Sequence, residues 1–204
     1  VDYAGIKRDK RFAPYLASLS ATSASTLTGH ERLAFWINVY NAYTIKLICD
    51  NFPLKSIRDL SNGKVWDRPL VTIDHITYSL NEIENDIIRP LGDHRIHFAL
   101  VCAARSCPPL RSEAYRADIL DAQLRDQAER FLADQSRNTF DTYTHVAKLS
   151  HVFEWYLGDF GRTHAQLLQA LQPFLAEPIK TSIKRELPLW TVQWMDYDWS
   201  LNGK

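Results

Sequence analysis

Residues 31–50 of the chain read ERLAFWINVYNAYTIKLICD, and this stretch decides the architecture. Apolar side chains recur in it at the three- and four-residue intervals of one helical face, which predicts an amphipathic helix. The residues on that face are Leu33, Ala34, Ile37, Ala42, Ile45, Ile48 and Cys49. Asn51-Phe52-Pro53 follows at once, and the helix should end there because proline disfavours helical backbone in the residue before it.

Two short runs rich in β-branched residues follow the helix. Val71-Thr72-Ile73 and Ile76-Thr77-Tyr78 flank Asp74-His75, which predicts a hairpin. Ser79-Leu80-Asn81-Glu82 has the spacing of a capping box and should open a short helix. The apolar run from His97 to Ala103 predicts a strand buried on both faces.

The second half of the sequence alternates helical and hairpin signals. We expect a long amphipathic helix over 113–132, a hairpin over 140–149, a helix from Ser150 and another from Thr163, where Gln166 would complete a capping box. The order of these elements favours an α+β fold. It should contain a small, mainly antiparallel sheet surrounded by helices.

Length and composition set the class of protein. The 204 residues, 46% of them hydrophobic, suffice to bury a core, and we expect a single domain over residues 1–204. Lys plus Arg and Asp plus Glu are equal at 24 each, so the basic excess typical of nucleic-acid binders is missing. No apolar run reaches the roughly 18 residues of a membrane-spanning helix. The aromatic tail, Trp190 to Trp199, should pack back on the domain.

The start of the sequence bears on where in the cell the protein is found. It begins with Val1 and shows no signal-peptide pattern. This predicts a trimmed protein, exported to the periplasm or to the outside of the cell after removal of an earlier segment. The cytoplasm is the alternative.

Three cysteines make an odd number, so at least one thiol is not in an intrachain disulfide. Cys49 lies on the apolar face of the predicted helix and is interpreted as a small core residue, as is Cys102. Cys107 lies at a polar turn, beside Ser106 and two prolines, which favours a reactive thiol. Cys107 is therefore the candidate nucleophile.

A cysteine nucleophile needs a base or a cation close by. His97 is the candidate base, and Arg105 and Arg111 are alternative positive neighbours. On a regular strand, His97 and Cys102 would face opposite sides about 16 Å apart, at about 3.3 Å per residue. Cys107 can therefore meet His97 only if the chain reverses between them.

Asn38 and Asn41 lie three residues apart and share one helical face with Ile45. Buried amides need hydrogen-bond partners, so the pair would orient a histidine, bind the backbone of a substrate, or cap an irregular loop. No metal or other cofactor is expected. Cys102 and Cys107 lack the Cys-x-x-Cys spacing of structural zinc sites, and no phosphate loop or dinucleotide motif occurs.

Several longer motifs resemble one protein family. The helix motif Phe35-Trp36-Ile37-Asn38-Val39-Tyr40-Asn41-Ala42, the Pro53–Ile57 step, the segment His97–Arg111 and the closing Tyr197–Asn202 are similar to the domain-of-unknown-function family 547 (DUF547). The resemblance runs from about Val1 to Asn202.

The resemblance implies a set of functional positions. Carried over residue by residue, they are Trp36, Asn38, Tyr40, Asn41, Glu84, Arg89, His97, Cys102, Cys107 and Arg111. His151 departs from the basic residue that the family pattern leads us to expect, which argues against a catalytic role for it. Eukaryotic relatives fused to glutaredoxin-like domains imply glutathione or thiol metabolism, and exported bacterial members imply the same location here.

A polar-faced helix followed by strands bearing a histidine is also loosely similar to papain- and transglutaminase-type folds. In those folds the nucleophile lies on the helix, where this chain has Asn38 and Asn41. The analogy therefore fails unless the site is rearranged.

Together these features predict a Cys–His hydrolase or transferase acting on a small peptide or thiol peptide such as glutathione. Cys107 would be the nucleophile, His97 the base, and Arg111 would hold a substrate carboxylate. Further residues expected to bind or orient the substrate are Asn38, Asn41, Trp36, Tyr40 and Glu84. The alternatives are a non-catalytic module of the cell envelope that binds such a ligand, and a purely structural envelope domain.

Overall fold

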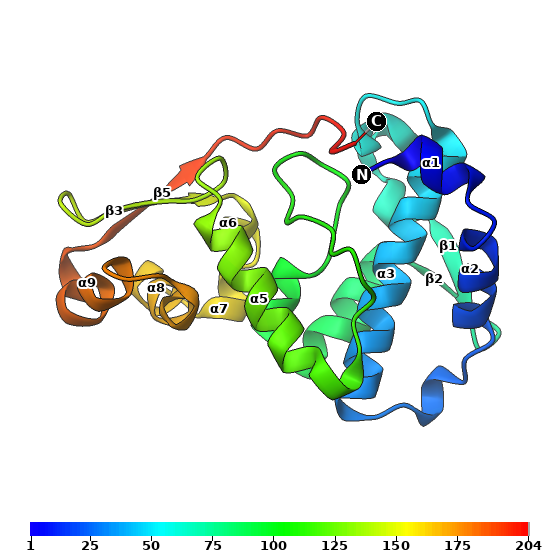
Figure 1. The fold of residues 1–204 in the computed structure, drawn as a ribbon, viewed down its shortest axis with the longest axis horizontal. Helices are drawn as coiled ribbons and strands as arrows, with labels where there is room; N and C mark the ends of the chain where they lie inside the picture. The colour runs from blue at the N-terminus through cyan, green and yellow to red at the C-terminus, as the bar shows by residue number, and fades with distance from the viewer. Residues whose placement is uncertain (204) are drawn as a thin grey trace. The chain divides into compact units, whose positions relative to one another are not determined.

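The computed structural model describes residues 1–203, which form two compact units (Figure 1). Unit 1 comprises Val1–Leu120 together with the residues from Asp198 onward. Unit 2 is Asp121–Tyr197 and is therefore inserted into the sequence of unit 1. The expectation of one domain over residues 1–204 stays a prediction.

The helix predicted from residues 31–50 is the central element of unit 1. This helix, α3, spans Gly29–Asn51, and the Phe52–Pro53 step follows it as predicted. Its apolar face is buried, with Ile37, Val39 and Ile48 at 0% exposure. Burial of such a face, rather than helix propensity alone, stabilises a helix in a protein.

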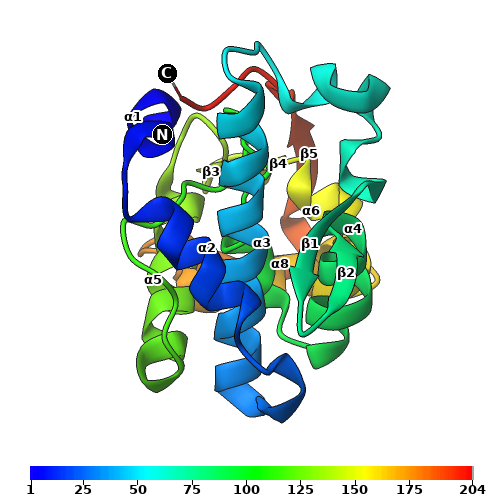
Figure 2. The same cartoon turned by 90° about the vertical axis from the view of Figure 1, so that its right-hand side faces the viewer.

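Smaller elements of unit 1 surround α3. Helices α1 (Tyr3–Arg8) and α2 (Phe12–Ser20) pack against it. The predicted hairpin is confirmed, with β1 (Pro69–Ile73) paired antiparallel to β2 (Ile76–Ser79). Figure 2 shows α1 to the left of α3 and the hairpin to its right.

The predicted capping box is also confirmed. Ser79 and Glu82 each accept the other's backbone N–H with their side chains, and this opens α4 (Leu80–Glu82). The chain continues as a π-helical turn, Ile83–Ile88, in which Glu84 is buried.

The apolar run from His97 to Ala103 is not a strand, and that prediction is wrong. His94–Phe98 forms a 3₁₀ helix, capped by an Asp93 carboxylate oxygen that accepts the Arg95 N–H at 3.0 Å. Residues 100–102 are irregular. A short apolar run is compatible with a buried strand and equally with buried irregular backbone. Here the Asn41 side chain of α3 supplies the hydrogen bonds that neighbouring strands would have made.

The helix predicted over 113–132 starts later than expected. Helix α5 is Leu120–Ala133, preceded by a 3₁₀ turn over Ala117–Ile119. The backbone N–H and C=O of Tyr115 are both bonded to Asn38, so these groups are not available to a helix.

Unit 2 combines a three-stranded sheet with short helices (Figure 1). The predicted hairpin is confirmed: β3 (Thr139–Asp141) pairs antiparallel with β4 (Val146–Ser150). The tail then returns as β5 (Thr191–Met195), which pairs in parallel with the other edge of β4.

Four α-helices connect β4 to β5. They are α6 (Val152–Trp155), α7 (Leu157–Phe160), α8 (His164–Leu171) and α9 (Ile179–Glu186). Thr163 caps α8 as predicted, but Gln166 Oε1 accepts the N–H of Arg162, one residue before the position a capping box requires. The α+β class is confirmed, while the papain- or transglutaminase-type likeness stays a prediction.

Candidate functional site

The candidate nucleophile lies in a short, closed loop, Cys102–Cys107. The backbone N–H of Cys102 donates to Cys107 Sγ at 2.8 Å, and the N–H of Cys107 donates to the Ala104 carbonyl at 3.2 Å. Ala103 has a left-handed φ of 61°, unusual for a residue with a side chain, which turns the chain back. The reversal expected between residues 102 and 107 is therefore present.

A segment from the far end of the sequence holds this loop. Arg105 N donates to the Ser200 carbonyl at 2.8 Å, and Asn202 N donates to the Ala103 carbonyl at 2.9 Å. Ser106 Oγ accepts the N–H of Asp198 at 2.9 Å. We call residues 198–202 the C-terminal segment. The loop and this segment pair as two short strands would, so the conformation of one depends on the other.

Asn41 fixes the backbone that precedes the loop. Its Nδ2 donates to the Ala99 carbonyl at 2.9 Å and its Oδ1 accepts the Val101 N–H at 3.0 Å. Cys107 Sγ contacts the intervening groups instead, the Leu100 carbonyl at 3.9 Å and the Cys102 N–H. Asn41 and Cys107 therefore bond to different, alternating backbone groups of residues 99–102.

The three thiols differ in exposure. Cys49 and Cys107 are buried, each 3% exposed, whereas Cys102 is half-buried. Burial raises the pKa of Cys49, and the charge of Asp50 raises it further. Burial also raises the pKa of the Tyr3 phenol, and the thiolate charges of Cys107, Cys49 and Cys102 add to this effect.

His97 lies in the 3₁₀ helix His94–Phe98 and is buried. The separation between His97 and Cys102 that we expected from a regular strand therefore does not apply. Its pairing with Cys107 stays a prediction, as does the role of the buried Glu84.

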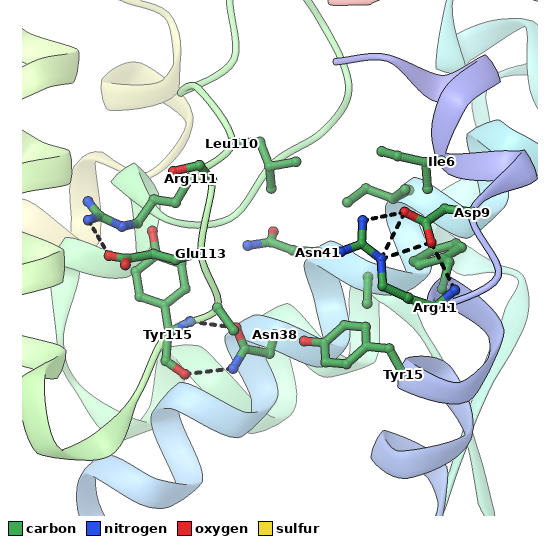
Figure 3. A pocket seen from close by; sticks show the side chains of 15 residues that line it. Ile6, Asp9, Arg11, Tyr15, Asn38, Asn41, Leu110, Arg111, Glu113 and Tyr115 are labelled. Carbon is green, nitrogen blue, oxygen red and sulfur yellow. Dashed lines mark hydrogen bonds and ion pairs between the residues drawn. The ribbon is translucent and has the colours of Figure 1, made fainter.

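A pocket of about 450 Å³ opens in unit 1, and it contains three of the predicted residues, Asn38, Asn41 and Arg111 (Figure 3). Its walls come from three parts of the sequence. They are Ile6, Asp9, Arg11, Phe12 and Tyr15; Asn38, Asn41, Ala42 and Ile45; and Leu110 to Tyr115. Cys107 and His97 do not line this pocket.

Asn38 repeats the arrangement of Asn41 one turn earlier. Its Nδ2 donates to the Tyr115 carbonyl at 2.8 Å and its Oδ1 accepts the Tyr115 N–H at 2.9 Å. Both asparagines therefore hold irregular backbone, which is one of the three roles that the sequence left open. In Figure 3 the Tyr15 hydroxyl points toward Asn38 from the opposite wall.

Two arginines of the pocket each form an ion pair with a carboxylate two residues away in the sequence. Arg111 is 11% exposed and donates to Glu113 Oε1 at 2.8 Å, and Figure 3 shows its guanidinium turned away from Arg11. Arg11 is 91% exposed and donates to Asp9 Oδ2 at 2.6 Å. The Arg11 hydrogen bond lowers the pKa of Asp9 to about 2, so this pair is ionised at neutral pH.

Two other predicted residues are buried in this structure, and their role toward a substrate stays a prediction. Trp36 and Tyr40 are buried, and the Trp36 ring packs edge-on against Tyr78 at 5.4 Å between centroids. Sequence reasoning missed Arg11 and Tyr15, because no local motif marks residues that become a site only when three segments meet.

Neither a metal site nor a membrane span is found in the part of the chain that the structure describes. No three His, Cys, Asp or Glu side chains within residues 1–203 are grouped to bind a metal ion. Over the same residues, every helix is too short or too polar to cross a lipid bilayer.

Comparison with known proteins identifies the family. No curated protein and no solved structure shows significant similarity to the chain. A family profile matches residues 24–132, which include α3, the hairpin, the cysteine loop and most of α5. The chain therefore belongs to the family described as "Protein of unknown function, DUF547".

Proposed function

We propose that unit 1 binds a small, peptide-like ligand with a free carboxylate in the pocket between α2, α3 and residues 110–115. The observation that supports this is the pocket itself. Its volume of about 450 Å³ lies within the range of roughly 300–1,000 Å³ that is usual for small-molecule sites. Glutathione and short peptides are ligands of this size class.

The lining combines an apolar wall with a few polar groups. Phe12, Ile45 and Leu110 would cover apolar parts of a ligand, and the Tyr15 hydroxyl would serve as a hydrogen-bond donor. A phenol is protonated at neutral pH, and partial burial raises the pKa of Tyr15 further, so this hydroxyl is available as a donor.

Arg11 is the residue proposed to bind the carboxylate. Its ion pair with Asp9 is exposed, and exposed pairs contribute little free energy. A ligand carboxylate can therefore take over one of the guanidinium donors at small cost, whereas Arg111 is more enclosed and already holds Glu113.

Isothermal titration calorimetry with glutathione, the dipeptide Gly-Phe and Gly-Phe amide tests this proposal. We expect the two acids to bind and the amide to bind several-fold more weakly, because a ligand carboxylate on the exposed Arg11 adds a modest but measurable free energy. Arg11→Gln should weaken binding of the acids by a similar factor.

Arg116→Gln is the matched control. Arg116 makes the same type of exposed pair, with Asp118 two residues later, but does not line the pocket. Equal binding of Gly-Phe and its amide, or equal losses in the two arginine variants, would contradict the proposal.

Thiol chemistry at Cys107 is a second candidate function, favoured by the Cys102 N–H that points at Cys107 Sγ. A hydrogen bond of this kind stabilises a thiolate, while burial opposes its formation. We propose Cys107 as nucleophile and His97 as base of a hydrolase or transferase for small thiol peptides, in an exported protein.

The pH dependence of Cys107 alkylation, followed by mass spectrometry, tests this second candidate. His97→Ala should shift the reactivity curve toward higher pH while circular dichroism shows that the fold is retained. If the two curves coincide, His97 is not the base.

A further inference from the structure

We infer that Cys102 and Cys107 form a reversible intrachain disulfide when the protein meets a small disulfide oxidant. This inference does not depend on the proposed ligand pocket. The contact of 2.8 Å between Cys102 N and Cys107 Sγ carries it. With standard bond lengths, this contact limits the separation of the two Cα atoms to roughly 7 Å, and disulfides span about 4.4–6.8 Å between Cα atoms.

The local backbone favours closure of this pair over any other. Residues 102 and 107 belong to one tight turn, whose reversal at Ala103 is already made. Cys49 lies within the long helix α3, where its Sγ donates to the Tyr3 carbonyl at 3.5 Å. A disulfide to Cys49 would have to break helical packing, whereas one between Cys102 and Cys107 needs side-chain rotation and a rearrangement confined to the turn.

The difference in exposure sets the order of the steps. Cys102 is half-buried and can meet an oxidant, whereas Cys107 is 3% exposed. The Cys102 thiolate attacks one sulfur of glutathione disulfide and expels one glutathione thiolate. The Cys107 thiolate then attacks the Cys102 sulfur and expels the second glutathione thiolate. The two cysteines are oxidised by two electrons in total, one glutathione disulfide becomes two glutathiones, and the two thiol protons pass to the expelled thiolates.

Oxidation should change the docking of the C-terminal segment. In the reduced form Cys107 Sγ accepts the Cys102 N–H, and the loop between the two cysteines bonds to Ser200 and Asn202. A disulfide moves Cys107 Sγ away from that N–H and reshapes residues 103–106. The bonds from this loop to residues 198–202 then weaken, so the segment exchanges its amide hydrogens faster.

Peptide mass spectrometry on the intact protein tests the inference. The protein is equilibrated in glutathione buffers of increasing oxidised fraction, quenched with acid, alkylated and digested. We expect a Cys102–Cys107 disulfide, with the loss of two hydrogens, and full alkylation of Cys49. Hydroxyethyl disulfide should give the same product, which separates this result from binding of glutathione in the pocket.

Two variants and one denatured sample are the controls. Cys49→Ser should form the same disulfide, while Cys102→Ser should form none. In urea the preference for a Cys102–Cys107 disulfide over disulfides with Cys49 should fall. In a separate measurement, hydrogen exchange of residues 198–202 should be at least several-fold faster in the oxidised native protein than in the reduced one.

Three outcomes would overturn the inference. They are a mixed glutathione disulfide on Cys102 that persists in the parent protein, a disulfide that includes Cys49, and a Cys102–Cys107 disulfide that forms only in urea. Because the parent protein alone distinguishes these outcomes, the test holds even if a cysteine variant fails to fold.

Discussion

Two asparagines of α3 make the backbone hydrogen bonds that a neighbouring strand would otherwise make. Asn38 and Asn41 each donate from Nδ2 to a carbonyl and accept a backbone N–H at Oδ1, the pattern by which one peptide group meets another in a sheet. An asparagine amide has this donor and acceptor side by side, and no carboxylate or hydroxyl of similar size can supply both at fixed geometry.

Replacing Asn41 by alanine should be more destabilising than replacing Asn38. The bonds of Asn41 are buried, so Asn41→Ala leaves two buried backbone groups unsatisfied and should cost about 2–4 kcal/mol. Asn38 bonds to partly buried groups, and Asn38→Ala should cost about 1–2 kcal/mol. Urea unfolding of both variants measures the difference. A larger loss for Asn38→Ala would contradict this explanation.

At the scale of elements, the 3₁₀ helix that carries His97 depends on one aspartate. Asp93 caps it and binds the Arg95 side chain at 2.7 Å. Burial alone would raise the pKa of Asp93, but the hydrogen bonds and charge of Arg95 together lower it. A carboxyl with a lowered pKa stabilises the fold above its unfolded pKa of about 3.9, and this stabilisation is lost as the pH falls through the folded value.

Asp93→Asn should therefore lower stability at pH 7 by about 0.5–2 kcal/mol, and the loss should shrink below about pH 4. Urea unfolding at pH 7 and pH 3 measures this. Asp118→Asn removes the exposed partner of Arg116 and should change stability by less than about 0.5 kcal/mol at either pH. A pH-independent loss in Asp93→Asn would rule out the charge as its cause.

Elements with local signals could be predicted from the sequence, and elements determined by distant side chains could not. The capping box at Ser79 and the periodicity of α3 lie within a few residues of the elements they define. The backbone at Ala99 and Tyr115 is instead held by asparagines 58 and 77 residues earlier. The sequence pointed to both asparagines and to the turn at Cys107, but no local pattern joins Arg11 and Tyr15 to the same pocket.

At the scale of the molecule, unit 1 joins the two ends of the sequence. Tyr3, 2% exposed, donates its hydroxyl to Asn202 Oδ1 at 2.7 Å, and Leu201 N donates to the Lys55 carbonyl at 2.8 Å. The Trp199 ring packs edge-on against Trp66 and lies under the Arg58 guanidinium. The C-terminal segment is thus an integral part of unit 1.

A double-mutant cycle on Tyr3 and Asn202 measures how much the hydrogen bond between these two residues contributes to stability. Asn202→Ala leaves a buried hydroxyl without its acceptor and should cost about 1–3 kcal/mol. Tyr3→Phe removes the hydroxyl, so adding Asn202→Ala to it should cost less, with a coupling energy of at least about 0.5 kcal/mol. Additive losses in thermal or urea unfolding would show that the bond does not join the ends.

The two parts of unit 1 are separated in the sequence by unit 2, so they are synthesised at different times. Residues 1–120 leave the ribosome first, yet the segment that closes their cysteine loop is translated only after the whole of Asp121–Tyr197. At roughly 5–20 residues per second, the nascent chain waits several seconds with this loop uncovered. During that interval we expect Cys102 and Cys107 to be more accessible than in the finished protein, so oxidants should reach these thiols more readily in the growing polypeptide.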